Sequence, residues 1–214
     1  PDWRHFLERK DIDAIVAVAP PEITTEVAMA CAAAGKAVCA TKPLFDHPER
    51  ITAPFYVDFW RLWSQAHIET RVARLEAGRI PRVFNYERKL TGSGPVRSFP
   101  GVFDYGPHVI AEMLDMGIDV TELRWRYEQD ERGDRCFGGI GGPFSVDVEL
   151  GNGFATPERE LGETDGEFYE ETPTHIGDEP KEAIMQKFCR SFLSDVSEGF
   201  VDTKLLTYSR DGMQ

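Results

Sequence analysis

Long apolar runs and positive charge are both scarce in this sequence. No stretch of its 214 residues approaches the roughly 18 consecutive apolar residues of a membrane-spanning helix, so we expect no membrane partner. The chain carries 24 Lys and Arg against 37 Asp and Glu, a formal net charge of -13. Nucleic acid binding needs a basic face for the phosphates, so we expect no nucleic-acid partner. We expect a cytoplasmic location, because the cysteines considered next suit free thiols in a reducing compartment.

The spacings typical of metal sites and redox motifs are absent as well. None of the four cysteines has CxxC spacing, and no histidine pair forms an HxxxH or HExxH motif. Cys31 and Cys39 fall on a predicted buried helix and strand, which favours free thiols in a reducing compartment. We therefore expect no metal site. The acidic segment 158–171 is most simply a solvated surface loop.

What the chain does contain, between residues 13 and 45, is a strand, a helix and a second strand. Residues 15–18 form an apolar run typical of a strand buried on both faces. Residues 23–34 favour a helix, and Gly35 is placed to end it. Residues 37–40 then favour a second, parallel strand. Ligands of such sheets bind at the carboxyl ends of the strands, which makes Lys42 the first candidate for a functional residue.

Two motifs in the chain share their order and context with a known family. The first combines a Pro-rich turn at 19–21, a helix ending in Ala-Gly-Lys at 34–36, and a strand followed by Thr-Lys-Pro at 41–43. The second places Asp104 and His108 in an Asp-x-x-x-His pattern on a predicted helix. Together they resemble the Gfo/Idh/MocA family (glucose-fructose oxidoreductase and inositol dehydrogenase) of NAD(P)-dependent oxidoreductases.

The resemblance implies an α/β fold: a partial Rossmann-type parallel sheet followed by an α+β domain with an open, mostly antiparallel sheet. We expect residues 1–54 to be the C-terminal part of a dinucleotide-binding domain. Residues 55–214 would then form a domain for substrate binding and oligomerisation, with helices near 66–77, 103–114 and 182–193. Because the family commonly pairs this sheet into dimers or tetramers, we expect a homo-oligomer.

The resemblance also implies which residues carry the chemistry. Asp104 and His108 are four apart, so on a helix they share one face. His108 would be the general acid/base or one member of a pair, and Asp104 would position it or bind a substrate hydroxyl. Lys42 would bind the substrate oxygen and stabilise alkoxide charge. Arg61 aligns with an arginine that often faces substrate, although a salt-bridged surface arginine fits its position equally well.

The implied cofactor is NAD or NADP, and the sequence does not choose between them. The nicotinamide would lie against the Pro-rich turn and the lysine motif, which contribute Ala19, Pro20, Thr41, Lys42 and Pro43. The substrate would be a small polyol or sugar. We therefore predict a dehydrogenase or reductase acting on a hydroxyl or keto carbon of a sugar, cyclitol or similar polyol.

Several departures from the family pattern stand beside these matches. No GxGxxG loop, which would cradle the cofactor pyrophosphate, occurs in the sequence. Thr41 replaces the glutamate of the usual Glu-Lys-Pro motif, and Thr24 stands where a histidine is common. We expect a fragment that lacks the first part of its Rossmann domain, with a further gap near Thr52 and Ala53. If the chain is complete, the alternative is a non-catalytic sugar-binding or oligomerisation module, a pseudoenzyme derived from this fold.

Overall fold

The computed structural model describes most of the chain in eleven stretches. These are residues 2–19, 21–42, 53–78, 83–89, 101–121, 123–130, 133–140, 145–151, 159–164, 167–171 and 174–199. The chain divides into two compact units. The first unit comprises Pro1–Trp60 and Gln186–Gln214, and the second comprises Arg61–Met185. No helix within the described stretches is long and apolar enough to cross a membrane.

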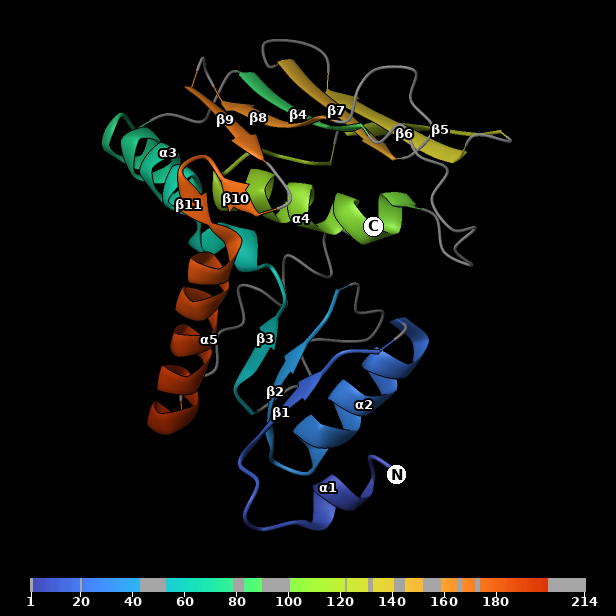
Figure 1. Ribbon diagram of the computed structural model, residues 1–214, viewed down its shortest axis with the longest axis vertical. Helices are drawn as coiled ribbons and strands as arrows, with labels where there is room; N and C mark the ends of the chain where they lie inside the picture. The colour runs from blue at the N-terminus through green and yellow to red at the C-terminus, as the bar shows by residue number, and fades with distance from the viewer. Residues whose placement is uncertain are drawn as a thin grey trace. The chain divides into compact units, whose positions relative to one another are not determined.

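The first unit is built on a short parallel sheet. Strands β1 (Ala14–Ala17), β2 (Ala37–Ala40) and β3 (Phe55–Val57) lie in the order β1-β2-β3, and both pairings are parallel. Helix α2 (Pro21–Ala33) connects β1 to β2 and packs beside them, as a parallel crossover requires (Figure 1). Gly35 has φ of 71°, the left-handed conformation that ends a helix. The predicted order of strand, helix and strand is observed. The prediction that the first strand is buried on both faces was wrong, because Val16 of β1 is 66% exposed.

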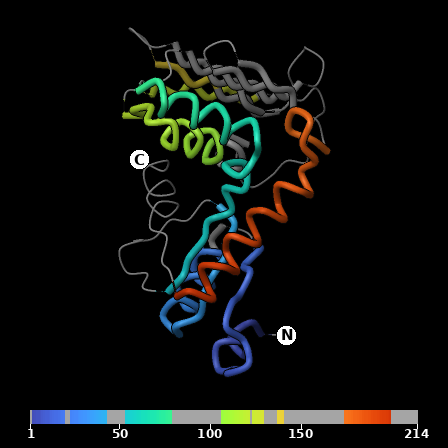
Figure 2. The backbone as a smooth tube through the Cα atoms, turned by 90° about the vertical axis from the view of Figure 1, so that its left-hand side faces the viewer, coloured from blue at the N-terminus to red at the C-terminus, as the bar shows by residue number. Residues whose placement is uncertain are grey.

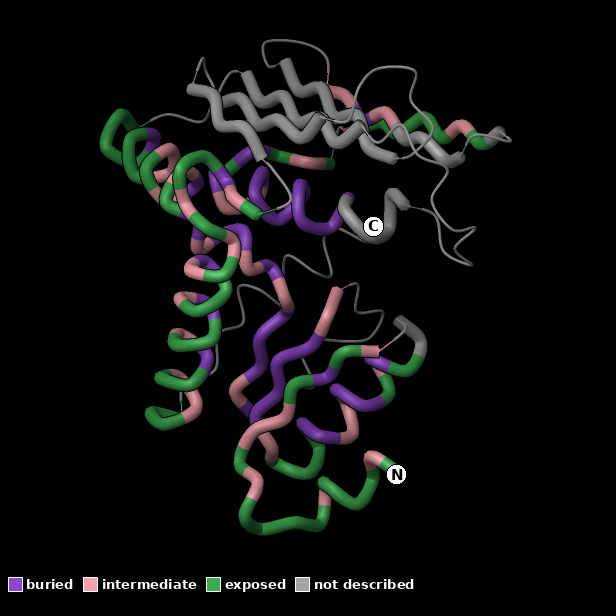
Figure 3. The backbone as a smooth tube through the Cα atoms, in the orientation of Figure 1, coloured by how far each residue is buried: buried purple, intermediate pink, exposed green. Residues whose placement is uncertain are grey.

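Strand β3 extends this first sheet, although the sequence analysis placed it at the start of the second domain. The three residues of β3 are all buried, and they pair in parallel with β2, with Tyr56 opposite Cys39. Helix α5 (Lys181–Glu198) covers Tyr56 with the rings of Phe188 and Phe192, whose centroids lie 5.6 and 5.4 Å from its own. The Tyr56 hydroxyl also donates to Asp195 at 2.6 Å. Figure 3 shows β2 and β3 as the buried centre of this unit.

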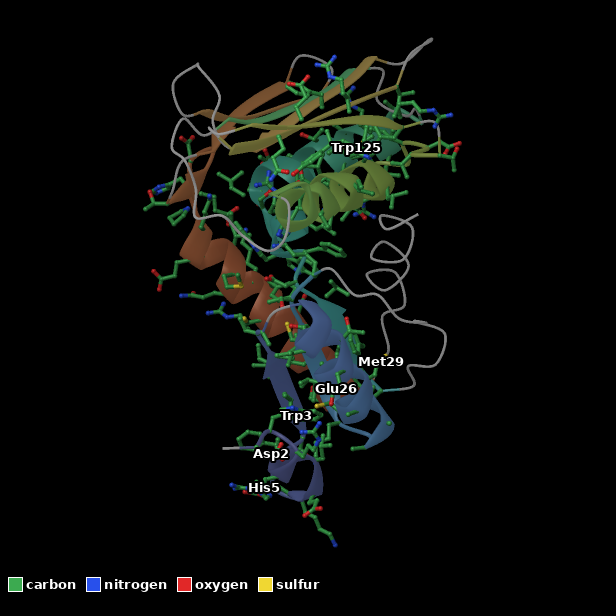
Figure 4. The ribbon with its side chains drawn as sticks, turned by 90° about the vertical axis from the view of Figure 1, so that its right-hand side faces the viewer. Asp2, Trp3, His5, Glu26, Met29 and Trp125 are labelled. Carbon is green, nitrogen blue, oxygen red and sulfur yellow. The ribbon has the colours of Figure 1, made fainter. Side chains whose placement is uncertain are left out.

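The N-terminal segment is tied to α2 by charge. Arg4, just before the short helix α1 (His5–Glu8), contacts the carboxylates of Asp2 at 3.3 Å and Glu26 at 2.7 Å. Figure 4 shows Asp2 and Trp3 beside Glu26 of α2. All three charged side chains are half exposed or more, so these contacts contribute little to stability.

The second unit consists of a large sheet with helices on one face. Its strands lie in the order β11-β10-β9-β8-β4-β7-β6-β5, and every pairing is antiparallel except β4 with β7. Helices α3 (Gln65–Glu76) and α4 (Gly101–Asp115) lie side by side against it (Figures 1 and 2). The predicted open, mostly antiparallel sheet is confirmed. The strands are β4 (Val83–Lys89), β5 (Arg124–Asp130), β6 (Gly133–Ile140), β7 (Ser145–Gly151), β8 (Arg159–Thr164), β9 (Glu167–Glu171), β10 (His175–Ile176) and β11 (Glu179–Pro180).

The acidic segment 158–171 is not the loop that its charge suggested. Residues of this segment form β8 and β9, which pair antiparallel in the middle of the sheet, with Gly162 opposite Tyr169. The sequence held a signal for this hairpin, because Asp165-Gly166 is a typical two-residue turn dipeptide between strands. The loop was predicted from the acidic composition alone, and that prediction was wrong.

A tryptophan and a glycine occupy opposite positions on the edge pair of this sheet. Trp125 of β5, labelled in Figure 4, pairs with Gly138 of β6. A Cβ atom at residue 138 would lie 2.5 Å from the indole ring, so the glycine leaves the space into which the ring packs. The glycine-rich stretch at 138–142 thus begins with a packing role in a strand.

Candidate active site

Two threonine side chains form a hydrogen-bonded chain at the carboxyl edge of the first sheet. Thr24, in the first turns of α2, donates its hydroxyl hydrogen to the carbonyl of Ala19 at 2.7 Å. Its Oγ1 also lies 3.3 Å from Oγ1 of Thr41, which follows β2 directly. Because Thr24 has only one hydroxyl hydrogen, Thr41 is the donor in the second bond. The lone pairs of Thr41 Oγ1 therefore stay available to accept a bond from a ligand.

Thr24 and Thr41 are the two residues that the sequence analysis noted as differing from the family pattern. They lie 17 residues apart in the chain, and Thr24 is completely buried. The backbone N–H of Thr41 also donates to the carbonyl of Ala17 at 3.1 Å, which ties the end of β2 to the end of β1. The two positions that depart from the pattern noted in the sequence therefore touch each other through the hydroxyl groups of Thr24 and Thr41. Neither position alone predicts this contact.

Lys42 and Asp58 occupy the same edge of the sheet. Lys42 is the second residue after β2 and is half-buried, while Asp58 is the first residue after β3. The N–H of Asp58 donates to the carbonyl of Ala40 at 2.8 Å, which holds the two strand ends together. Burial raises the pKa of the Asp58 carboxyl, while the positive charge of Lys42 and the N–H of Trp60 act in the opposite direction.

Asp58 is a candidate that sequence reasoning missed. Its Oδ1 atom is buried, and no donor within the described part of the chain reaches it. The signal was available, since an acidic residue directly after a parallel strand lies where α/β sheets bind ligands. The sequence analysis placed residues 55–59 in the second domain, so Asp58 was not recognised as the end of a parallel strand.

The first unit contains two buried thiols, in Cys31 and Cys39, and an exposed one, in Cys189. Cys31 and Cys39 are both buried and unpaired, as predicted. Burial raises the pKa of Cys39 to about 12 and raises that of Cys31 as well, so neither thiol is ionised near neutral pH. Burial and a raised pKa both disfavour a nucleophilic role for these two cysteines.

In the second unit, helix α4 carries Asp104 and His108. His108 is 5% exposed and lies in the middle of the helix, directly after Pro107. A proline at this position removes one N–H from the helical hydrogen-bond ladder, and kinks are typical there. The predicted helical placement of both residues is observed, whereas the side chain of Asp104 lies outside the described part of the structure.

Arg61 forms a buried ion pair with the same helix. It lies in the 3-10 helix η2 (Trp60–Trp63), and its Nε contacts Glu112 Oε1 at 2.5 Å. Both side chains are 2% exposed, so the pair is neither a surface salt bridge nor open to solvent. Glu112 follows His108 by one helical turn, and the ion pair therefore fixes α4 beside the candidate catalytic histidine. A contact of Arg61 with substrate stays a prediction.

A second cluster of polar and charged side chains lies at the end of α4. Asp115 contacts His67 Nε2 at 2.8 Å and Arg71 Nε at 3.1 Å, both from α3. A cavity of ≈ 330 Å³ opens beside it, lined by Arg71, Arg74, Leu75, Gly78, Leu114, Asp115, Met116 and Gly117. None of the predicted site residues lines this cavity.

The predicted residues therefore form two groups. Ala19, Thr41 and Lys42 share the carboxyl edge of the first sheet, and Arg61, Asp104 and His108 belong to the second unit. Pro20 and Pro43 lie outside the described residues.

No protein-family model and no curated protein matches the chain. Solved structures do. Scyllo-inositol dehydrogenase from Lactobacillus casei, with bound NAD(H) and scyllo-inositol, is 12% identical and has a TM-score of 0.73 over 100% of this chain and 79% of that one. Levoglucosan dehydrogenase, in complex with NADH and levoglucosan, is 13% identical with a TM-score of 0.74 over 99% and 78%. UDP-N-acetylglucosamine 3-dehydrogenase from Acidithiobacillus ferrooxidans is 12% identical with a TM-score of 0.72 over 100% and 80%.

Identities this low establish the architecture and leave the chemistry to be argued from the residues. The resemblance drawn from the two sequence motifs is confirmed at that level. The chain has the fold of these solved dehydrogenases.

Proposed function

We propose that the protein is an NAD(P)-dependent oxidoreductase that moves a hydride between a nicotinamide and a hydroxyl or keto carbon of a sugar, cyclitol or similar polyol. The observation that carries this proposal is Lys42 at the carboxyl edge of the parallel sheet. Ligands of open α/β sheets bind at that edge. Support comes from the shared fold, which in two solved dehydrogenases holds NAD(H) with scyllo-inositol or NADH with levoglucosan.

Lys42 is proposed to bind the reacting oxygen. Its ammonium group donates hydrogen bonds and carries a positive charge, which favours the partial alkoxide that forms as the hydroxyl loses its proton. Asp58 and the strand ends hold the backbone around it, because Asp58 donates to Ala40 two residues before Lys42. A cation fixed at a strand end is suited to this role, since it needs little reorganisation during the reaction.

His108 is proposed to be the general acid/base, with Asp104 as its neighbour on α4. In the oxidative direction the histidine takes the proton of the substrate hydroxyl, and the carbinol carbon gives up its hydride, which leaves a carbonyl product. In the reductive direction the same histidine returns the proton. His108 is buried, and the Arg61–Glu112 pair lies one turn further along the same helix.

The residues at the sheet edge fit part of a nicotinamide cofactor. The nicotinamide supplies the site that accepts or donates the hydride. The lone pairs of Thr41 Oγ1 fit donors such as a carboxamide or a ribose hydroxyl. The 214 residues contain no GxGxxG loop for the pyrophosphate. The alternative function is a non-catalytic sugar-binding or oligomerisation module. Cofactor affinity therefore decides between the two functions.

A titration of NADH and of NADPH, followed by nicotinamide fluorescence, tests this proposal directly. Saturable binding of either cofactor is expected, with turnover of at least one compound from a panel of scyllo-inositol, levoglucosan and UDP-N-acetylglucosamine. If neither cofactor saturates while a panel compound still binds, the sugar-binding module replaces the enzyme.

The role of Lys42 is tested by replacing it with methionine. Lys42→Met is expected to lower kcat by roughly 100-fold, the magnitude typical of a lost oxyanion donor. Lys10→Met is the matched control, because Lys10 is an exposed lysine of the same unit. Equal loss in the two variants would assign Lys42 to the surface instead.

We also propose that the protein is a homo-oligomer that pairs through its large sheet. The aromatic side chains of Trp125 and Tyr127 are 37% and 44% exposed on β5, which is the last strand of that sheet. Light scattering coupled to size exclusion tests the proposal. A mass of 24.2 kDa for this chain at micromolar concentration would exclude it.

A further inference from the structure

Asp58 combines two properties that a structural residue seldom combines. It follows β3 directly at the carboxyl edge of the first sheet, where its backbone N–H donates to the carbonyl of Ala40 at 2.8 Å. Its Oδ1 is nevertheless buried without a donor from the described residues. A buried carboxylate oxygen without a hydrogen-bond donor costs free energy, so a reason for its presence must be found.

Capping of the next helix does not supply that reason. The N–H of Trp60 hydrogen-bonds to the Asp58 carboxylate at the start of η2, as in an Asx turn. Such a turn needs one side-chain oxygen and no charge, and asparagine or serine would provide it. The second oxygen and the negative charge of Asp58 are left unexplained by this role.

The surroundings of Asp58 indicate what kind of ligand the second oxygen would bind. Lys42 contributes a donor and a positive charge at the same edge, close enough for its charge to act on the Asp58 carboxyl. An anionic group would be repelled by Asp58. A metal ion would need more ligands, and no group of three or more metal-ligating side chains occurs among the residues that the structure describes. A hydroxyl group both donates and accepts, so it matches a carboxylate beside an ammonium.

We propose that Asp58 is a ligand-binding residue whose carboxylate, together with Lys42, binds a hydroxyl group at the carboxyl edge of the first sheet. The hydroxyl donates to Asp58, and its oxygen accepts from Lys42. Two ligands carry this chemistry, namely the ribose of a nicotinamide cofactor and the polyol substrate. This inference rests on the proposed function and adds to it the group that recognises the hydroxyl.

Asp58→Asn is the variant that tests the inference. Asparagine keeps the oxygen that caps η2 and has nearly the same shape, but it removes the charge. Asp11→Asn is the matched control, because Asp11 is an exposed aspartate of the same unit and its loss changes the net charge equally. Thermal melting of each variant shows that it is folded.

Isothermal titration with NADH, and then with the best-binding compound of the polyol panel in the presence of saturating NADH, gives the readout. We expect Asp58→Asn to weaken one of these affinities by about 10-fold or more, the effect of losing a charge-assisted hydrogen bond. A loss confined to NADH assigns the hydroxyl to the ribose. A loss confined to the polyol assigns it to the substrate.

Two other outcomes would overturn the inference, and they are distinguishable. If wild-type protein binds both ligands and Asp58→Asn binds them equally well, Asp58 is a helix cap and the proposed function stands. If wild-type protein binds neither NADH nor any panel compound, the proposed function fails and this inference fails with it.

Discussion

The two units handle their charged side chains in opposite ways. In the second unit, Arg61 and Glu112 are both 2% exposed and form a direct ion pair. At the edge of the first sheet, Lys42 and Asp58 are only half-buried, and one carboxylate oxygen of Asp58 meets no donor among the described residues. A buried, fully paired set of charges fixes a structure, because removing either partner is costly. A half-buried set with an unused oxygen is suited to bind a ligand.

The two units also differ in the kind of hydrogen bond that their side chains make. The Thr24–Thr41 chain is neutral and ends on a backbone carbonyl, whereas the contacts of Asp115 join it to His67 and Arg71. Neutral hydrogen bonds contribute less than charge-assisted ones, but they leave the local charge unchanged. The edge of the first sheet therefore has its charge set by Lys42 and Asp58.

The largest effect is expected from breaking the buried ion pair. Glu112→Leu leaves the guanidinium of Arg61 buried without its partner, and we expect the free energy of unfolding to fall by about 3–5 kcal/mol. Urea denaturation measures this change. The double variant Arg61→Met with Glu112→Leu is expected to recover most of the loss, since two apolar side chains replace two charges. If the double variant is as unstable as Glu112→Leu alone, the loss does not come from the unpaired buried charge of Arg61.

His108→Ala tests whether helix α4 carries a catalytic residue besides the ion-paired Glu112 and Asp115. We expect kcat to fall by roughly 100-fold or more, because general acid–base catalysis contributes at least that factor. Steady-state kinetics across pH are the measurement, and the limb that reports the base should disappear from the profile. His5→Ala, an exposed histidine of α1, is the control. An unchanged kcat would remove His108 from catalysis and leave it as a core residue.

Thr24→Val tests the neutral chain at the edge of the first sheet. Valine keeps the shape of threonine but leaves the carbonyl of Ala19 and the hydroxyl of Thr41 without this partner, so we expect a loss of about 1–2 kcal/mol in stability. Thermal melting provides the measurement. Thr41→Val, at the half-buried end of the chain, should cost less than Thr24→Val. The reverse order would show that Thr41 is the residue that holds the edge.

The smallest expected effect is a dependence of stability on pH at Asp58. Because burial raises its pKa in the folded state, the native protein holds this proton more tightly than the unfolded chain does. The stability that the folded protein gains from this tighter proton binding is fully present below the unfolded pKa of about 4. It is lost as pH rises through the folded pKa of Asp58. Compared with wild type, Asp58→Asn should therefore gain relative stability between pH 4 and 7 in urea titrations. A constant difference across this range would mean that burial does not perturb Asp58.

The elements that sequence reasoning found are those whose pattern is local. The apolar strand at 15–18, the helix ended by Gly35 and the strand at 37–40 are each set by neighbouring residues. The helical spacing of Asp104 and His108 likewise predicted that they share α4. The strand β3 was placed in the other domain, because its partner β2 lies across residues 41–54 and pairing across such a segment has no local signal.

The sequence by itself determined which residues had the right chemistry and where the strands end. Lys42, Thr41 and Ala19 lie at the carboxyl edge because strand direction follows from chain order. Only the tertiary structure decided which of the side chains meet. Thr24 and Thr41 are 17 residues apart, Arg61 and Glu112 are 51 apart, and His67 and Asp115 are 48 apart. Such contacts form only when the sheets and helices pack, because burial, which makes a charge pair costly or a carboxylate reactive, is a property of the folded chain.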